Sequence, residues 1–138
     1  MVPLVFVYGT LREGEANFGF MRRARCVARK AWIHGQLIDT GEGYPGLIRT
    51  HTSVPVDQPP QVVGEVYEVS LSLLAWLDRL ERFIEPGHPD NVYERIETTV
   101  KADTQTLKAW VYEYVTDIPE SERFFDWIAY RKRRNNAD

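Results

Sequence analysis

Short segments with a strand-like hydrophobic pattern alternate with polar and glycine-containing segments along the 138-residue chain. A continuous apolar run at Leu4–Tyr8 predicts a buried strand, and the alternation of Val62–Val69 predicts a strand with one inward face. Val92–Val100 and Leu107–Val115 are rich in β-branched and aromatic residues and are joined by the polar sequence ADTQT. This pattern predicts two strands paired as a hairpin.

Glycine and proline divide the segment that follows the first strand. Cys26–Asp39 predicts a long strand in which Gly35 marks a bend or a bulge. A loop rich in glycine and proline surrounds Tyr44, and we expect Leu47–Ile48 to form a brief strand after it. The stretch His51–Gln61 contains three prolines, which predict an irregular excursion at the surface.

Three segments show helical features. Glu15–Arg23 is expected to form one or two helical turns. Ser70 is a suitable N-cap for a helix that runs to about Phe83, before a loop that contains proline and glycine. Apolar residues at helical spacing predict a last helix at Glu120–Arg133.

These elements amount to about six strands, most of them adjacent in sequence, together with two well-defined helices. No repeat, low-complexity tract or proline-rich linker divides the chain. The sequence therefore predicts a single α+β domain, residues 1–138, with a small and mainly antiparallel sheet that is able to close into a barrel.

Composition excludes several classes of function. The formal net charge is −3 and the isoelectric point is about 5.6, which argues against a general nucleic-acid binder because neutralising phosphates requires an excess of Lys and Arg. No apolar run approaches the ~20 residues of a membrane span, and the start lacks the basic and apolar regions of a secretory signal. We therefore expect a cytoplasmic protein that does not associate with membranes.

The residues that usually bind metals are sparse. Cys26 is the only cysteine, and the three histidines lie at wide and irregular separations. We expect neither a disulfide nor a metal site.

One carboxylate lies on the apolar side of the helix predicted at residues 70–84. At 100° per residue, an arc of about 120° contains the apolar positions Leu73, Leu74, Leu77, Leu80 and Ile84. Glu81 falls inside the same arc, and burying an ionised carboxylate costs several kcal/mol unless it is paired or faces a water-filled cleft. From geometry alone, Glu81 either pairs with an arginine, escapes to solvent at the helix end, or carries a proton with a raised pKa.

Asp78 borders this apolar side and is a second carboxylate to consider as an acid/base partner. In the middle of a helix, we expect it instead to be a partly exposed group bonded to a strand residue.

An ordered series of motifs covers about 110 residues of the chain. The series consists of VFVYGTLREGEAN (5–17), YPGLI (44–48), VVGEVYEV (62–69), LDRLE (77–81), VYERIETTV (92–100) and AWVYEY (109–114). In this series the chain resembles the γ-glutamylcyclotransferase-like superfamily, which includes γ-glutamylamine cyclotransferase and the AIG2-like proteins. The combination of YGTLR after a strand with LDxxE on a later helix is the most specific part of the likeness.

The resemblance implies a small β-barrel with flanking helices, a cavity at the barrel mouth and a catalytic glutamate, which is Glu81 in this chain. It also implies that the loop formed by Tyr8, Gly9, Thr10 and Leu11 grips a γ-glutamyl group. The reaction needs no cofactor, because the α-amine of a γ-glutamyl amide can attack its own γ-carbonyl to give 5-oxoproline and a free amine. Glu81 would then move the proton.

Further residues belong to the predicted site. The backbone N–H groups after Tyr8 can bind the α-carboxylate or the developing oxyanion, and Gly9 permits close approach of a ligand. Tyr44, Tyr93 and Tyr112 either line the cavity or pack in the core, with Tyr112 the preferred candidate for a hydrogen bond to the ligand. Arg12 either pairs with a substrate carboxylate or is solvated.

Two other functions stay open at this point: an amide-cleaving acyltransferase that acts on a non-glutamyl substrate, and a binding or regulatory module for a small carboxylate. The leaving amine and the oligomeric state are also open. The loops at residues 50–61 and 84–91 are each long enough to cover the pocket.

Overall fold

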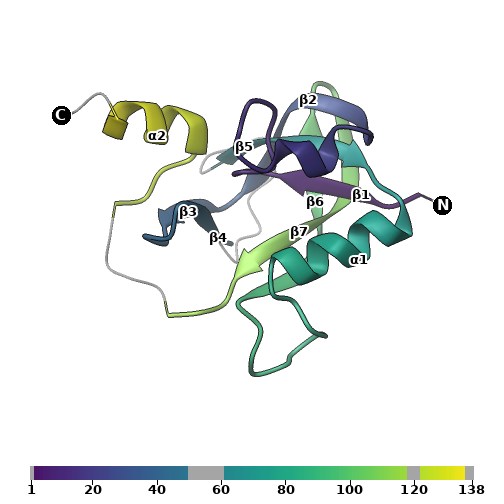
Figure 1. The fold of residues 1–138 in the computed structure, drawn as a ribbon. Helices are drawn as coiled ribbons and strands as arrows, with labels where there is room; N and C mark the ends of the chain where they lie inside the picture. Colours follow the sequence, from purple (N-terminus) through teal and green to yellow (C-terminus); the bar gives the residue numbers. More distant parts are fainter. Residues whose placement is uncertain (1, 50–60, 118–121, 136–138) are drawn as a thin grey trace.

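A closed barrel of five strands is the centre of the computed structural model, which describes residues 2–49, 61–117 and 122–135 (Figure 1). In order around the barrel, the strands are β1 (Leu4–Val7), β5 (Gln61–Glu68), β2 (Arg25–His34), β6 (Tyr93–Ala102) and β7 (Gln105–Tyr114). Neighbouring strands are antiparallel except at the closure, where β1 and β7 run parallel with Val5 opposite Trp110. The predicted α+β class, the mainly antiparallel barrel and the β6–β7 hairpin are confirmed.

The bend expected at Gly35 is confirmed, but the single long strand predicted at Cys26–Asp39 is wrong, because the chain leaves the barrel at Gly35 and continues in a separate strand. This residue has φ +152°, and a Cβ there would lie 2.9 Å from the carbonyl oxygen of Ile48. After it, β3 (Gln36–Asp39) pairs with β4 (Pro45–Ile48) in a separate two-stranded sheet. The brief strand expected at 47–48 is therefore two residues longer.

Helices flank the barrel (Figure 1). The 3-10 helix η1 (Phe18–Met21) lies within the predicted helical segment 15–23. The helix α1 (Leu71–Leu80) begins as predicted, since the Ser70 hydroxyl oxygen accepts a hydrogen bond from the backbone N–H of Leu73 at 3.1 Å.

The last helix, α2 (Trp127–Asn135), begins later than the sequence predicts. The expected start at Glu120 lies outside the described residues. Phe124 lies before the helix, and its backbone exchanges hydrogen bonds with Leu37 of β3. The pattern at Phe124 therefore reflects contact with the sheet and not a helical turn.

Two apolar clusters hold these elements together. One fills the barrel interior around Phe6, Ile33 and Val66 and extends to the aromatic residues of α2. The other lies between α1 and the outer face of β1, with Leu77 fully buried in it. The end of α1 is thus fixed against the strand that leads into the YGTL loop.

Membrane and metal features are absent from the part of the chain that the structure describes. No helix in it is both long and apolar enough to cross a membrane. Its His, Cys, Asp and Glu side chains form no group of three or more that could hold a metal ion. The predicted excursion at 51–61 falls, except for Gln61, outside the described residues.

We predict that Gly64→Ala lowers the free energy of unfolding by about 3 kcal/mol, because an added methyl group would overlap the barrel interior. A Cβ at Gly64 would lie 2.3 Å from the carbonyl oxygen of Val7 and 2.5 Å from Cζ of Phe6. Urea unfolding measures the effect. The control is Gly19→Ala, where a Cβ meets nothing within 4 Å and a change within about 0.5 kcal/mol is expected. Equal stability of the two variants would contradict the close approach at Gly64.

Candidate active site

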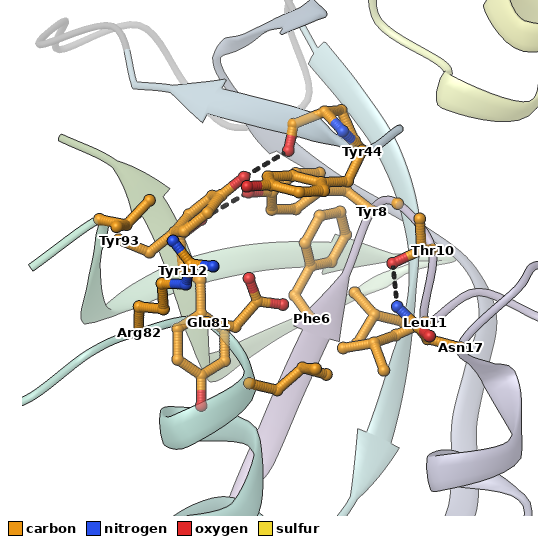
Figure 2. A pocket seen from close by; sticks show the side chains of 15 residues that line it. Phe6, Tyr8, Thr10, Leu11, Asn17, Tyr44, Glu81, Arg82, Tyr93 and Tyr112 are labelled. Atoms are coloured by element: carbon orange, nitrogen blue, oxygen red, sulfur yellow. Dashed lines mark hydrogen bonds between the residues drawn. The ribbon is translucent and has the colours of Figure 1, made fainter. Parts of the chain in front are cut away.

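A cavity of about 180 Å³ opens between the loop that follows β1, the start of β4 and the end of α1 (Figure 2). Its walls come from both apolar clusters and from the loop residues 8–11. Thus the YGTL loop and LDRLE, about 70 positions apart in the sequence, meet at this cavity. The predicted site residues Tyr8, Gly9, Thr10, Leu11, Glu81 and Tyr112 all line it.

The end of α1 sets the position of Glu81. The N–H of Phe83 donates to the carbonyl oxygen of Asp78 at 2.8 Å, and the N–H of Arg82 donates to that of Arg79 at 3.1 Å. This pair of bonds is a Schellman motif, which requires a left-handed residue after the C-cap. Arg82 takes that role with φ +55°, and Glu81 is the C-cap.

The predicted helix end at Phe83 is therefore wrong by three residues. The predicted face is correct for Leu74 and Leu77, which are buried, and Glu81 shares their side. Ile84 is a second correction: it lies past the left-handed turn, and its side chain is 57% exposed. The turn at Arg82 breaks the periodicity that placed Ile84 on the apolar side.

Glu81 is a carboxylate without a protein partner. Its side chain points into the cavity beside Phe6, with Thr10 and Leu11 on one side and Tyr93 and Arg82 on the other (Figure 2). Within the described residues, it makes no hydrogen bond and no ion pair. Burial raises the pKa of Glu81 to about 7, because the charged form loses hydration that no protein group replaces.

The loop after β1 presents unused hydrogen-bond donors. None of the backbone N–H groups of Gly9, Thr10 and Leu11 donates to another described residue. The Thr10 hydroxyl oxygen accepts from the Asn17 side-chain amide at 3.0 Å, so its own proton remains available to a ligand. The loop can therefore offer up to four donors to an oxygen-rich ligand.

Gly9 lets this loop approach β4. A Cβ at Gly9 would lie 2.7 Å from Cγ of Pro45, closer than any side chain tolerates without movement. The absence of a side chain at this position therefore sets the width of the cavity between the loop and the glycine- and proline-rich segment.

The tyrosine hydroxyls of the cavity wall are bound by the protein. Tyr8 donates to the carbonyl oxygen of Tyr112 at 2.7 Å, Tyr93 donates to that of Pro45 at 2.8 Å, and Tyr112 donates to the Asp78 carboxylate at 2.7 Å. Burial raises the pKa of each of these phenols, which stay neutral. The three rings form a fixed wall, and the Tyr112 hydroxyl is left only as an acceptor.

Two further residues that the sequence left open have clear positions. Tyr44 lines the cavity and donates its hydroxyl hydrogen to Glu42 at 2.8 Å. The pKa of Tyr44 is raised to about 12, mainly by burial and secondly by this carboxylate. Asp78 is bonded to both strands of the hairpin, to Arg95 of β6 at 2.8 Å and to Tyr112 of β7. The expectation that Asp78 is partly exposed and bonded to a strand residue is confirmed.

Neither expectation for Arg12 describes its position. Its side chain is neither solvated nor directed at the cavity, because it forms ion pairs with Glu65 at 3.0 Å and Asp126 at 3.1 Å. Only 8% of Arg12 is exposed. Both partners lie more than 50 positions away in the sequence, so no local signal could have indicated them.

Sequence reasoning missed two polar residues of the cavity, Asn17 and Arg82. Asn17 is the last residue of the motif VFVYGTLREGEAN, and its position in that motif could have indicated a role in the cavity. Arg82 gave no signal, since arginine seldom adopts the left-handed conformation that brings it to the cavity wall.

Comparisons with known proteins agree on one family. The family model described as "Gamma-glutamyl cyclotransferase, AIG2-like" matches residues 5–129. The gamma-L-glutamyl-butirosin B gamma-glutamyl cyclotransferase of Niallia circulans is 44% identical over 94% of this chain and 78% of its own length. The gamma-glutamylaminecyclotransferase A of Danio rerio is 30% identical over 90% of this chain and 73% of its own.

Solved structures show the same fold. YkqA from Bacillus subtilis superposes with a TM-score of 0.74 at 23% identity, and this chain corresponds to 44% of that protein. An AIG2-like protein from Mus musculus superposes with a TM-score of 0.66 at 25% identity, over 86% of this chain and 81% of the mouse protein.

We predict that Glu81→Gln stabilises the protein relative to wild type increasingly as the pH rises from 4.5 to about 8. The pKa of Glu81 is about 7 in the folded state, against 4.5 for a fully hydrated glutamate. Its neutral form therefore favours folding below pH 4.5, and this contribution is lost as the pH rises through 7. The difference of about 2.5 pKa units corresponds to about 3 kcal/mol.

Urea unfolding of the two proteins across this pH range measures the change. Glu85→Gln is the control, because Glu85 is exposed and only four positions away. A stability difference for Glu81→Gln that stays constant with pH would show that Glu81 is hydrated in the folded protein.

Proposed function

This chain belongs to the γ-glutamyl cyclotransferase, AIG2-like family, and from that premise we propose that Glu81 is the general acid/base of its reaction. The protein is an enzyme of the γ-glutamylcyclotransferase type. We propose a γ-glutamyl amide as substrate, with 5-oxoproline and a free amine as products. The observation that carries the proposal is a largely buried carboxylate that shares a cavity with backbone N–H groups, neither of which has a partner among the described residues.

The reaction is a transfer within one molecule. The nitrogen of the α-amine attacks the γ-carbonyl carbon, a new C–N bond closes a five-membered ring, and the original amide C–N bond breaks. Counted from the α-ammonium form, the attacking nitrogen loses one proton before attack and a second on ring closure. The leaving nitrogen takes up both and departs as an ammonium ion, so no oxidant, reductant or cofactor is required. Because nucleophile and carbonyl belong to the same substrate, the cavity has chiefly to select the folded conformer.

Glu81 is suited to carry that proton. An α-ammonium group has an ordinary pKa of about 8, and a base with a pKa near 7 can take its proton far more readily than one with a pKa near 4.5. After ring closure begins, the protonated Glu81 can return the proton to the departing nitrogen. Its apolar surroundings supply the matched pKa, and its freedom from ion pairs leaves both oxygens available.

The loop after β1 is proposed to bind the negative part of the substrate. The N–H groups of Gly9, Thr10 and Leu11 and the Thr10 hydroxyl can surround the α-carboxylate, or the oxyanion that develops at the γ-carbonyl. Tyr8 and Tyr112 are proposed to contact the substrate through their ring surfaces, since their hydroxyl hydrogens are already donated. With its carboxylate bound by the loop, the substrate can place its α-amine next to Glu81.

We predict that Glu81→Gln and Glu81→Ala each lower kcat by about 10²- to 10⁴-fold, the usual contribution of positioned proton transfer. The measurement is release of 5-oxoproline from a panel of γ-glutamyl amines. In the wild type, the rate is expected to fall as the pH drops through about 7, because Glu81 then becomes protonated.

Glu85→Gln is the matched control and should keep wild-type activity. Full activity in both Glu81 variants would remove Glu81 from the mechanism. Release of an amine from a non-glutamyl amide, without 5-oxoproline, would identify another amide-cleaving reaction. Binding of 5-oxoproline without turnover of any donor would identify a binding module.

A further inference from the structure

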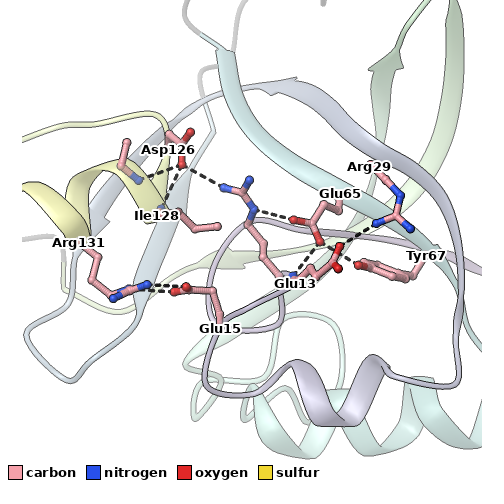
Figure 3. A network of polar contacts seen from close by, with 10 residues as sticks. Glu13, Glu15, Arg29, Glu65, Tyr67, Asp126, Ile128 and Arg131 are labelled. Atoms are coloured by element: carbon pink, nitrogen blue, oxygen red, sulfur yellow. Dashed lines mark hydrogen bonds and ion pairs between the residues drawn. The ribbon is translucent and has the colours of Figure 1, made fainter.

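The far end of the YGTL loop is held by ion pairs to Glu65 and Asp126, two carboxylates from separate parts of the fold (Figure 3). Nε of Arg12 lies 3.0 Å from Glu65, a residue of β5, and Nη1 lies 3.1 Å from Asp126, just before α2. Arg12 is 8% exposed and Glu65 is 6% exposed. The residue that follows the proposed substrate-binding N–H groups is therefore fixed to two distant parts of the fold.

Glu65 holds both ends of this loop. At the near end, Val7 of β1 is the cross-strand partner of Glu65. At the far end, Oε2 of Glu65 binds Arg12, while Oε1 accepts from the backbone N–H of Glu13 at 3.0 Å and from the Tyr67 hydroxyl at 2.8 Å. Glu65 thus fixes both ends of residues 8–12 on β5, the near end through strand pairing of its backbone with Val7 and the far end through its side chain.

Asp126 connects the same loop to α2. Its Oδ1 accepts from Arg12 and from the N–H groups of Ile128 and Ala129, at 3.0 and 3.2 Å, which cap the first turn of α2. A second contact joins the two segments, because Arg131 of α2 donates two hydrogen bonds to Glu15, at 3.0 and 2.6 Å. Both ends of segment 12–15 are therefore attached to α2 or to the residue that caps it.

A purely structural need explains this arrangement poorly. Buried ion pairs are often no more stabilising than apolar side chains of similar volume, because both charges lose their hydration. Such a pair does restrict orientation. The planar guanidinium of Arg12 can bind Glu65 and Asp126 in only a narrow range of geometries, so the backbone at Arg12 is held in one position. That restriction acts one residue away from Leu11 and three away from Gly9.

We propose that Arg12 is a positioning residue, and that its ion pairs with Glu65 and Asp126 aim the N–H groups of residues 9–11 at the substrate carboxylate. This inference rests on the proposed function of the loop. It assigns α2, whose described residues do not line the cavity, a role in substrate affinity. Displacing the loop lengthens its hydrogen bonds to the substrate carboxylate and so weakens substrate binding, while Glu81 keeps its place at the end of α1.

The test compares Arg12→Met, Arg12→Lys and a control, Arg25→Met. Arg25 forms an exposed ion pair with Glu68, also on β5 but remote from the loop end. Arg12→Met should raise KM for a γ-glutamyl amide at least about tenfold, while kcat and its pH profile change little. Arg12→Lys should recover part of the loss, and Arg25→Met should behave as wild type.

Asp126→Asn serves as a second variant that is expected to fold. Its side-chain oxygen can still cap α2, whereas the charge that attracts Arg12 is gone. A rise in KM of about threefold, in the same direction as for Arg12→Met, would support the proposal. A lowered melting temperature with unchanged KM in both variants would show that Arg12 is only structural and would overturn it.

A readout without turnover separates this inference from the proposed function. Backbone order parameters of residues 9–11, from ¹⁵N relaxation of the free protein, should fall from about 0.85 in wild type toward flexible values in Arg12→Met. If the wild type releases no 5-oxoproline from any donor, the proposed function fails. In that case unchanged order parameters would also overturn the positioning role, and lowered ones would support it.

Discussion

The left-handed turn at Arg82 is the constraint on which the site depends. This turn follows the C-cap residue Glu81 and terminates α1, and it lets Phe83 fold back into the apolar cluster that contains Leu77. A residue other than glycine in this conformation costs roughly 1–2 kcal/mol, and the packing of Phe83 together with the two Schellman hydrogen bonds offsets it. The outcome is a carboxylate held at the helix end, on the apolar side and facing the cavity.

The raised pKa of Glu81 comes from burial, and two arginines of the fold pair with other carboxylates. Arg95 forms an ion pair with Asp78, one turn before Glu81, and its guanidinium lies over the Trp110 ring at 4.5 Å. Arg12 is bound by Glu65 and Asp126. Within the described residues, Arg82 lines the cavity without an ion pair to Glu81. A buried carboxylate without an ion pair favours its neutral form, which is the condition for a base that works near neutral pH.

Local sequence signals predicted the features that depend on near neighbours. The spacing of Leu74 and Leu77 placed Glu81 on the correct face, and Ser70 marked the helix start. The helix end could not be predicted, because Arg82 occupies a backbone conformation that normally indicates glycine. The pairing of Arg12 depends on β5 and α2, which only the closed barrel brings together. The helical pattern and the family resemblance therefore indicated residues that line one cavity, and long-range contacts determined the polar details around it.

The supply of polar groups in the cavity determines what it can recognise. Three tyrosines of the wall donate their hydroxyl hydrogens to other protein groups: Tyr8, Tyr93 and Tyr112. They can therefore offer a ligand only apolar ring surface and phenol oxygens as weak acceptors. Within the described residues, the free polar groups of the cavity are an acceptor at Glu81, donors along the loop after β1 and the guanidinium of Arg82. A ligand that fits must bring a protonated nitrogen for the first and an oxygen-rich group for the second, a few bonds apart. The α-amine and α-carboxylate of a γ-glutamyl group have this arrangement, and a substrate that lacked either would leave a desolvated polar group without a partner.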